Sequence, residues 1–188
     1  MFPFVRLIKD MLIARRQPPI GLTDMHVTYH RVWPWDLDAF LELNNGRALT
    51  RYDLGRMGMG ARVGLIDTLR RERWGLTMAG SSVRYRRRLR GFERFEMRTR
   101  AVCWDDKFTY IEQSMWKANG DCASHVLYRS AVTDKNGIVP PHRVLAAMGE
   151  DPTSPPTPDW IAAWIAAEAT RPRPPMQDTP VRAVANAA

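Results

Sequence analysis

Residues 35–48 have the sequence WDLDAFLELNNGRA. Asp36 and Asp38 stand among aromatic and aliphatic residues, so part of each carboxylate is expected to be buried, and a buried carboxylate needs hydrogen bonds or a chemical role. Asn44 follows them, and Asn and Asp are both preferred at the position that starts a helix. The segment therefore predicts a loop that presents carboxylates immediately before a helix.

The chain on either side of this loop supports that interpretation. Residues 25–33 alternate in a β-branched and aromatic pattern that predicts a strand, which Pro34 ends. From Gly46 to about Leu69 the apolar spacing predicts one long central helix. Glycines in its interior each cost about 1 kcal/mol relative to alanine, so we expect a sheet to approach the helix closely there.

Four strand-like segments follow, at about 80–90, 92–104, 107–118 and 121–134. The Asn119-Gly120 pair is a strong hairpin signal, and the segments predict an antiparallel meander. One strand, a glycine-rich helix and four antiparallel strands can bury the helix if the sheet curls around it. This arrangement is the α+β hotdog fold, with helical extensions at both termini.

Length and composition favour one globular domain within 188 residues, of which 45% are hydrophobic and 26% charged. We expect an amphipathic segment at 1–20, the main domain at 21–150, and a proline-rich linker, short helix and flexible tail at 151–188. The first 16 residues have one apolar helical face beside basic residues. That face can rest on an anionic membrane surface, or it can pack on its own domain or on a second subunit.

The remaining composition limits the partners and the compartment. Two cysteines without CxxC spacing, and four histidines without ligand spacing, indicate neither a disulfide framework nor a metal site, and no cofactor is predicted. A reducing, cytoplasmic location is the simplest expectation. The net charge of +8 suits a phosphate-bearing ligand, but the tryptophans fall in patterns that core packing explains, so no nucleic acid is expected.

Three segments occur in order along the chain: DLDAFLELNNGRALTRYDLGR, RYRRRLRGFERFEMRTR and AVCWDDKFTYIEQ. From about Tyr29 to Gly149 the sequence resembles the hotdog-fold acyl-CoA thioesterases of the hydroxybenzoyl-CoA thioesterase type, and most closely proteins similar to thioesterase superfamily member six. In that family the loop and helix start resemble D-x-D-x-x-x-H-x-N-N-x-x-Y, with the second aspartate catalytic. Here Glu42 replaces the histidine and Ala48 replaces the tyrosine.

The resemblance implies that Asp38 is the reacting carboxylate, as nucleophile or as the base that activates water. Backbone N–H groups at Asn45 and Gly46 would stabilise the oxyanion at the positive end of the helix dipole. From the residues alone, the favoured interpretation of Asp38 is a helix cap or a carboxylate bound to a loop amide. Asp36 is interpreted as structural, and Asp53, on the central helix, is the reserve acid.

Substrate contacts are expected from residues near this site and from basic residues further along the chain. Glu42 is either a second acid or a solvent-facing loop residue. Alternation along VRYRRRLR places Arg87 on the apolar side of its strand, where a guanidinium needs an anionic partner. The predicted substrate-binding residues are Glu42, Asn44, Arg87, Arg88 and Lys107.

The predicted function is hydrolysis of an acyl-CoA or acyl-carrier thioester. The alternatives are a non-catalytic acyl or acyl-CoA binding protein on the same fold, and a basic interaction protein. An open sheet edge predicts a homodimer or a dimer of dimers. The acyl chain and its carrier are not specified by the sequence.

Overall fold

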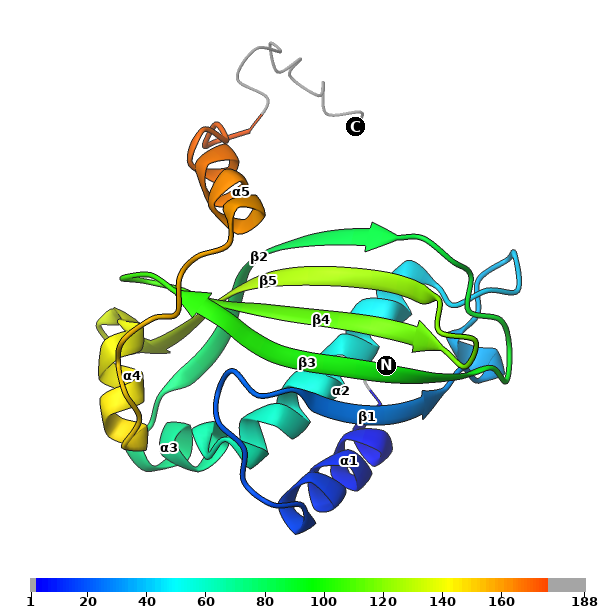
Figure 1. The fold of residues 1–188 in the computed structure, drawn as a ribbon, viewed down its shortest axis with the longest axis horizontal. Helices are drawn as coiled ribbons and strands as arrows, with labels where there is room; N and C mark the ends of the chain where they lie inside the picture. Colours follow the sequence, from blue (N-terminus) through cyan, green and yellow to red (C-terminus); the bar gives the residue numbers. More distant parts are fainter. Residues whose placement is uncertain (1–2, 176–188) are drawn as a thin grey trace, which may run out of the picture. The chain divides into compact units, whose positions relative to one another are not determined.

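The computed structural model describes residues 3–175. In this part of the chain six strands form one antiparallel sheet (Figure 1). Neighbouring strands lie in the order β1-β3-β4-β5-β2, and β6 pairs with β5. The strands are β1 (His26–Arg31), β2 (Gly75–Tyr85), β3 (Arg94–Trp104), β4 (Thr109–Lys117), β5 (Cys122–Asp134) and β6 (Gly137–Val139).

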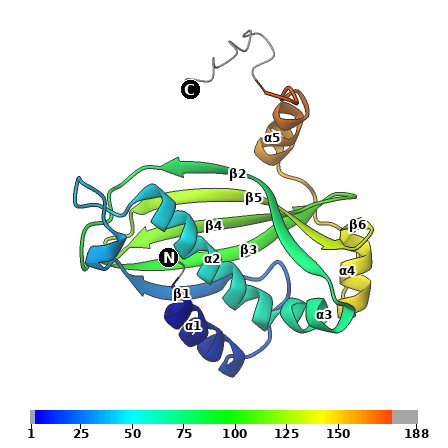
Figure 2. The same cartoon turned by 180° about the vertical axis from the view of Figure 1, so that it is seen from behind.

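The helices are the second component of the fold. They are α1 (Phe4–Arg16), α2 (Asn45–Arg62), α3 (Leu65–Glu72), α4 (Pro141–Met148) and α5 (Asp159–Ala169), with a short 3-10 turn at Pro34–Asp36. Helix α2 lies across the concave face of the curled sheet, as the reverse view shows (Figure 2). The sheet wrapped around α2 confirms the predicted α+β hotdog fold.

Two glycines of α2 allow the sheet to approach the helix closely. A Cβ on Gly55 would lie 2.5 Å from the Met97 sulfur and 2.9 Å from the Thr99 hydroxyl. A Cβ on Gly58 would lie 2.8 Å from Nε2 of His26. The expected close approach of the sheet therefore explains why α2 contains glycines, although glycine lowers the stability of a helix.

The prediction of a single long helix from Gly46 to about Leu69 is wrong. Helix α2 ends at Arg62, and α3 begins at Leu65. Gly64 between them has a φ of +80°, in the left-handed region that glycine enters without steric cost. The apolar periodicity continues across the break, which is why the sequence pattern did not reveal it.

The predicted four-stranded meander is also only partly correct. Strands β3, β4 and β5 are consecutive neighbours, but β2 lies beyond β5 at the edge of the sheet. Residues 86–93 leave β2 and cross the end of the sheet, where the N–H groups of Arg86 and Arg87 both donate to the Ala123 carbonyl, at 2.8 and 3.0 Å. Strand β2 consequently ends at Tyr85, five residues before the predicted strand did.

Helix α1 packs against α2 beside strand β1 (Figures 1 and 2). Its Asp10 and Ala14 are buried, whereas its outer face exposes several apolar side chains. The chain divides into two compact units, residues 1–155 and 156–188. Within the described residues, no helix combines the length and apolarity that a bilayer crossing requires.

Candidate functional site

A cavity of about 210 Å³ opens at the N-terminus of α2. Its walls come from the loop before α2, the first turns of α2, the segment after β2, and the start of β5. The cavity brings together four of the predicted site residues. Its lining is Glu42, Leu43, Asn45, Ala48, Tyr85, Arg86, Arg87, Arg88, Leu89, Ala123 and Ser124.

Asp38 holds the turn that leads into this cavity. Its side chain is half-buried, and Oδ1 accepts hydrogen bonds from the N–H groups of Phe40 at 2.8 Å and Glu42 at 3.4 Å. Its own N–H donates to the Glu42 carbonyl at 2.9 Å. Among residues 3–175, both hydrogen bonds to this carboxylate use Oδ1. Asp38 therefore caps a turn, and its side chain is not among those that line the cavity.

Asp36 occupies a different environment two residues earlier. Its buried carboxylate forms ion pairs with Arg51 of α2 and with Arg6 of α1, the latter at 3.1 Å. It also accepts a hydrogen bond from the Trp33 N–H at 3.0 Å. Asp36 thus ties α1, α2 and the loop together, which agrees with its predicted structural role.

Asn44 caps the start of α2. Its Oδ1 accepts from the N–H groups of Gly46 at 2.9 Å and Arg47 at 3.2 Å. The predicted oxyanion donor at Gly46 is therefore already engaged. Since the first N–H groups of a helix have no intrahelical partner, the Asn45 N–H is the donor that suits a ligand in the cavity.

The charged wall of the cavity is built by Glu42 and the segment after β2. Glu42 Oε2 lies 2.9 Å from Arg88 Nε. Arg87 does not lie on an inward face, because β2 has ended before it; its side chain is 63% exposed and its Nε is 3.9 Å from Asp121 Oδ2. The prediction for Arg87 as a buried guanidinium is wrong, although the residue still lines the cavity.

Two hydroxyl groups at the cavity were not predicted. Ser124 lines the cavity, and its hydroxyl is 2.7 Å from the buried Tyr52 hydroxyl. The Tyr85 hydroxyl donates to the Asn45 carbonyl at 3.4 Å. Strand register alone brings these side chains to the helix start, so no local sequence signal could have identified them.

Asp53 lies further along α2, in a separate polar network. Its carboxylate pairs with Arg56, which also donates to Gln113 Oε1 at 2.8 Å and lies over the Tyr128 ring at 3.7 Å. Burial raises the pKa of Asp53, and the attraction of Arg56 opposes that rise. Asp53, predicted as the reserve acid, is thus engaged in an ion pair with Arg56 and does not line the cavity.

Lys107 is not part of this arrangement. It lies in the turn between β3 and β4 and is not among the residues that line the cavity. In the same turn Asp105 accepts hydrogen bonds from the N–H groups of Lys107 and Phe108, at 2.8 and 2.7 Å. Lys107 and Asp38 are therefore not brought into one site within a subunit.

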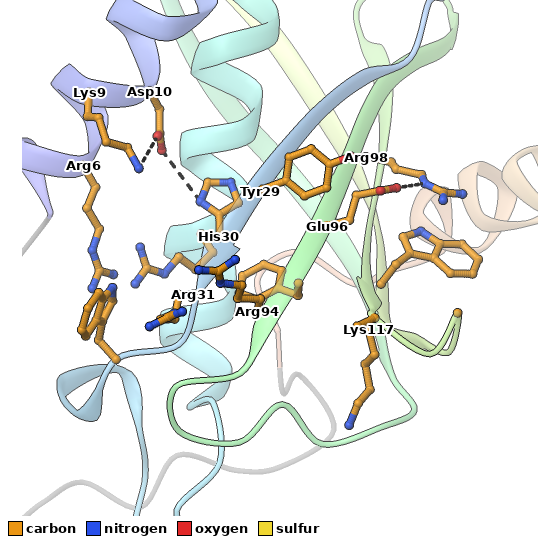
Figure 3. Close-up of a pocket in the computed structure, with 16 residues that line it drawn as sticks. Arg6, Lys9, Asp10, Tyr29, His30, Arg31, Arg94, Glu96, Arg98 and Lys117 are labelled. Carbon is orange, nitrogen blue, oxygen red and sulfur yellow. Dashed lines mark hydrogen bonds and ion pairs between the residues drawn. The ribbon is translucent and has the colours of Figure 1, made fainter.

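A larger hollow of about 710 Å³ lies between α1, β1, β3 and the β4–β5 turn (Figure 3). It contains a buried polar pair, because His30 Nδ1 is 3.9 Å from Asp10 Oδ2 and its Nε2 is 2.9 Å from the Thr28 hydroxyl. Burial lowers the pKa of His30 to about 4, and the opposing attraction of Asp10 is smaller. The hollow is lined by seven basic and two acidic side chains: Arg6, Lys9, Arg31, Arg51, Arg94, Arg98 and Lys117, with Asp10 and Glu96.

Metal ligation has no candidate in the described part of the chain. Among residues 3–175, no group of three or more His, Cys, Asp or Glu side chains is placed to hold a metal ion.

Comparison with known proteins points to one family. A family model described as "Thioesterase-like superfamily" matches residues 32–165. "Protein THEM6" of Xenopus laevis is 36% identical over 164 residues, which are 86% of this chain and 78% of that protein. "Protein THEM6" of Drosophila melanogaster is 30% identical over 165 residues, 86% of this chain and 83% of that protein.

Solved structures share the fold at low sequence identity. The DHNA-CoA thioesterase of Staphylococcus aureus has a TM-score of 0.58 and 13% identity, and the match covers 77% of this chain and 91% of that one. The gentisyl-coenzyme A thioesterase BH1999 has a TM-score of 0.56 and 16% identity, with coverage of 61% and 94%.

Proposed function

Because the chain belongs to the thioesterase-like superfamily, we propose that it hydrolyses an acyl-CoA or acyl-carrier thioester at the cavity before α2. The observation that carries the proposal is the turn at 38–42. It fixes one oxygen of the Asp38 carboxylate and ends at Glu42, which lines the cavity together with the N-terminus of α2 and a row of arginines.

The proposed chemistry uses the two oxygens of Asp38 differently. Oδ1 is held by the Phe40 N–H, and Oδ2 either attacks the thioester carbonyl or takes a proton from the attacking water. Charge that develops on the carbonyl oxygen is stabilised by the Asn45 N–H and the positive end of α2. The thiol leaves, and one water is consumed for each thioester cleaved.

The cavity wall is suited to an anionic acyl carrier. Arg86, Arg87 and Arg88 present three guanidinium groups at its rim, and guanidinium groups bind phosphate through paired hydrogen bonds. Arg88 is held by Glu42 at 2.9 Å, so Glu42 is proposed to position that arginine. This assigns Glu42 a binding role at the position where the family has histidine.

Assay of free thiol release from a panel of acyl-CoA thioesters tests the proposal. We expect Asp38→Asn to lower kcat/KM by about 10²-fold or more. The fold should be retained, since an asparagine Oδ1 can accept the same two turn hydrogen bonds. Glu42→Gln should chiefly raise KM, because it loosens Arg88.

Asp53→Asn is the matched control, because it changes a half-buried carboxylate to the same amide in the separate network around Arg56. Loss of hydrolysis in Asp53→Asn with Asp38→Asn still active would move the chemistry onto α2. Tight binding of acyl-CoA without thiol release at any chain length would favour the binding protein instead; the replacements at Glu42 and Ala48 support that alternative.

A further inference from the structure

Large apolar side chains are exposed on two adjoining loops at one end of the sheet. Trp35, Phe40 and Leu41, in the loop between β1 and α2, are 64%, 80% and 71% exposed, and Phe92, in the turn before β3, is 58% exposed. The two loops are held together, since the Leu43 N–H donates to the Leu89 carbonyl at 2.8 Å. We call Trp35, Phe40, Leu41 and Phe92 the apolar tips.

The backbone at two of these tips is unusual for the residues that occupy it. Leu41 has a φ of +57° and Phe92 a φ of +63°. This left-handed conformation is strained for side chains with a Cβ and normally selects glycine or asparagine at a turn. Strain of this kind persists only where the surrounding structure enforces it, and it clusters at functional sites. Large apolar side chains are therefore presented to solvent where a turn alone would favour small polar ones.

Helix α1 extends the same apolar surface. Val5 and Ile8 are 84% and 59% exposed. The first turns of α1 lie beside the tips, because Arg6 pairs with Asp36 and its guanidinium is 5.5 Å from the centre of the Trp35 ring. Trp35 stacks on Trp33, which contacts Phe92 edge-on at 6.1 Å. The tips and the start of α1 form one surface.

The hollow between α1, β1 and β3, which we call the basic hollow, adjoins this surface. Its basic side chains outnumber its acidic side chains. Arg31 and Arg94 are directly opposite each other in the β1–β3 register, an arrangement in which like charges repel. Within residues 3–175 neither forms an ion pair with a carboxylate. Nη2 of Arg6 is buried without a hydrogen-bond partner among the same residues. Arg6, Arg31 and Arg94 lie close together on one side of the hollow, whereas Arg98 lies apart from them and pairs with Glu96 (Figure 3). The first three arginines suit an anion.

We propose that this end of the protein docks on an anionic lipid bilayer. The apolar tips and the outer face of α1 enter the boundary between headgroups and acyl chains, and Arg31 and Arg94 bind the phosphate of an anionic headgroup. Exposed aromatic and aliphatic side chains beside clustered arginines match the two parts of such an interface. Nucleic acid would match only the arginines. The proposal is independent of the thioesterase proposal, because neither experiment uses the other's readout.

Vesicle flotation with the full chain tests this inference. We expect binding to phosphatidylcholine vesicles that contain phosphatidylglycerol, and at least about tenfold weaker binding to phosphatidylcholine alone, since a few arginines each contribute through surface charge. Leu41→Asn with Phe92→Asn should weaken binding about tenfold or more. Asparagine tolerates the left-handed backbone, so these variants should fold, as a thermal melt can verify. Arg31→Gln with Arg94→Gln should abolish the preference for anionic vesicles.

Ile138→Asn is the matched control, because Ile138 is 44% exposed on β6, away from the apolar tips. Its flotation should equal that of the parent. Equal flotation of parent and tip variants would overturn the proposal. The proposal would also be overturned if the tip variants lost self-association while their flotation stayed unchanged. That result would assign the surface to contact with a second copy of the chain. Binding of free glycerol phosphate by a protein that ignores all vesicles would assign the hollow to a soluble ligand.

Discussion

Asp36 and Asp38 are two residues apart, yet they meet different surroundings. In an extended segment, residues two positions apart lie on the same face. Asp36, however, sits in a 3-10 turn, and Asp38 sits in the turn that follows it. Asp36 is enclosed by two arginines, and Asp38 is held by amides of its own turn. Sequence reasoning identified both carboxylates, and only the structure showed which partners hold each one.

The two aspartates should respond differently to truncation. Asp36→Ala leaves Arg51 buried without its carboxylate, and breaking such a pair costs about 3–5 kcal/mol of unfolding free energy. Asp38→Ala removes a turn cap and should cost about 1 kcal/mol. Urea denaturation of both variants measures the difference. Equal losses would mean that Asp36 does not tie α1 and α2 to the loop.

Arg87 illustrates why individual site residues were harder to predict. Its assignment to an inward face assumed that the strand continued through residue 90, and β2 ends at Tyr85. Strand β2 ends where its pairing with β5 ends, and β5 is distant from β2 in the sequence. Arg87 and Arg88 were predicted from the pattern along their segment, while the orientation of their side chains needed the structure.

At the scale of single elements, α2 was the most predictable part of the fold. Its start follows from the Asn44 cap and its glycines from the approach of the sheet. Its end did not follow, because Gly64 is one of several glycines in the segment and only its φ distinguishes it. The position of β2 beyond β5 was missed for a related reason: strand order is set by pairing, which local patterns do not record.

Two glycines of α2 should separate packing from helix propensity. Gly55→Ala places a Cβ 2.5 Å from the Met97 sulfur, and overpacking of this kind typically costs about 1–3 kcal/mol. At Gly60 the nearest atom is Ile66 Cδ1, at 3.3 Å, so Gly60→Ala should be neutral or gain up to about 1 kcal/mol of helix propensity. Chemical denaturation compares them. A stable Gly55→Ala protein would contradict the close approach of the sheet.

The exposed edge of β2 predicts self-association. Strand β2 pairs with β5 on one side only within the described residues, and its side chains are mostly exposed. Edge-to-edge pairing with a second copy would satisfy its open hydrogen bonds. We expect a dimer in analytical ultracentrifugation at micromolar concentration.

Charge placed at the middle of β2 should dissociate this dimer. Ser81→Glu with Ser82→Glu would set like charges opposite each other across a two-fold axis, which is destabilising. Lys135→Glu with Asn136→Glu, in the exposed turn after β5, adds acidic side chains away from the edge and should leave the dimer intact. A parent protein that sediments only as a monomer would refute the prediction.

For the whole molecule, two buried histidines should make stability depend on pH. Burial is the main cause that lowers the pKa of His26 and of His30 from 6.5 to about 4. The unfolded chain binds a proton at each residue below about pH 6.5, whereas the folded chain keeps both neutral down to about pH 4. The folded state thus binds fewer protons in this window, so the free energy of unfolding falls as the pH drops from about 6.5 to 4.

Urea titrations at several pH values between 7 and 4 measure this dependence. His26→Asn should remove up to one proton from the slope, about 1.4 kcal/mol for each pH unit. His142→Asn, at an exposed position of α4, provides the same substitution at a solvent-facing histidine for comparison. A free energy of unfolding that stays constant from pH 6.5 to 4 would show that the histidines take up protons without opposing the fold.

The basic hollow is the whole-molecule feature that the sequence concealed. Arg31 and Arg94 are separated by α2, α3 and β2 in the chain, and only the pairing of β1 with β3 sets them opposite each other. Net charge indicated an anionic partner without locating it. Helix α1 completes the hollow by packing against α2. The periodicity of the first 16 residues predicted an apolar face on this helix but not the surface that it contacts.

The order of the strands also bears on how the chain is synthesised. A ribosome releases β2 before β3, β4 and β5, but the pairing of Gly75 with Thr133 and of Tyr85 with Ser124 requires β5 to be complete. The hairpins of β3, β4 and β5 close through short turns, while attaching β2 closes a long loop at an entropic cost. During translation β2 therefore waits unpaired, and we expect its open edges to favour aggregation in this interval.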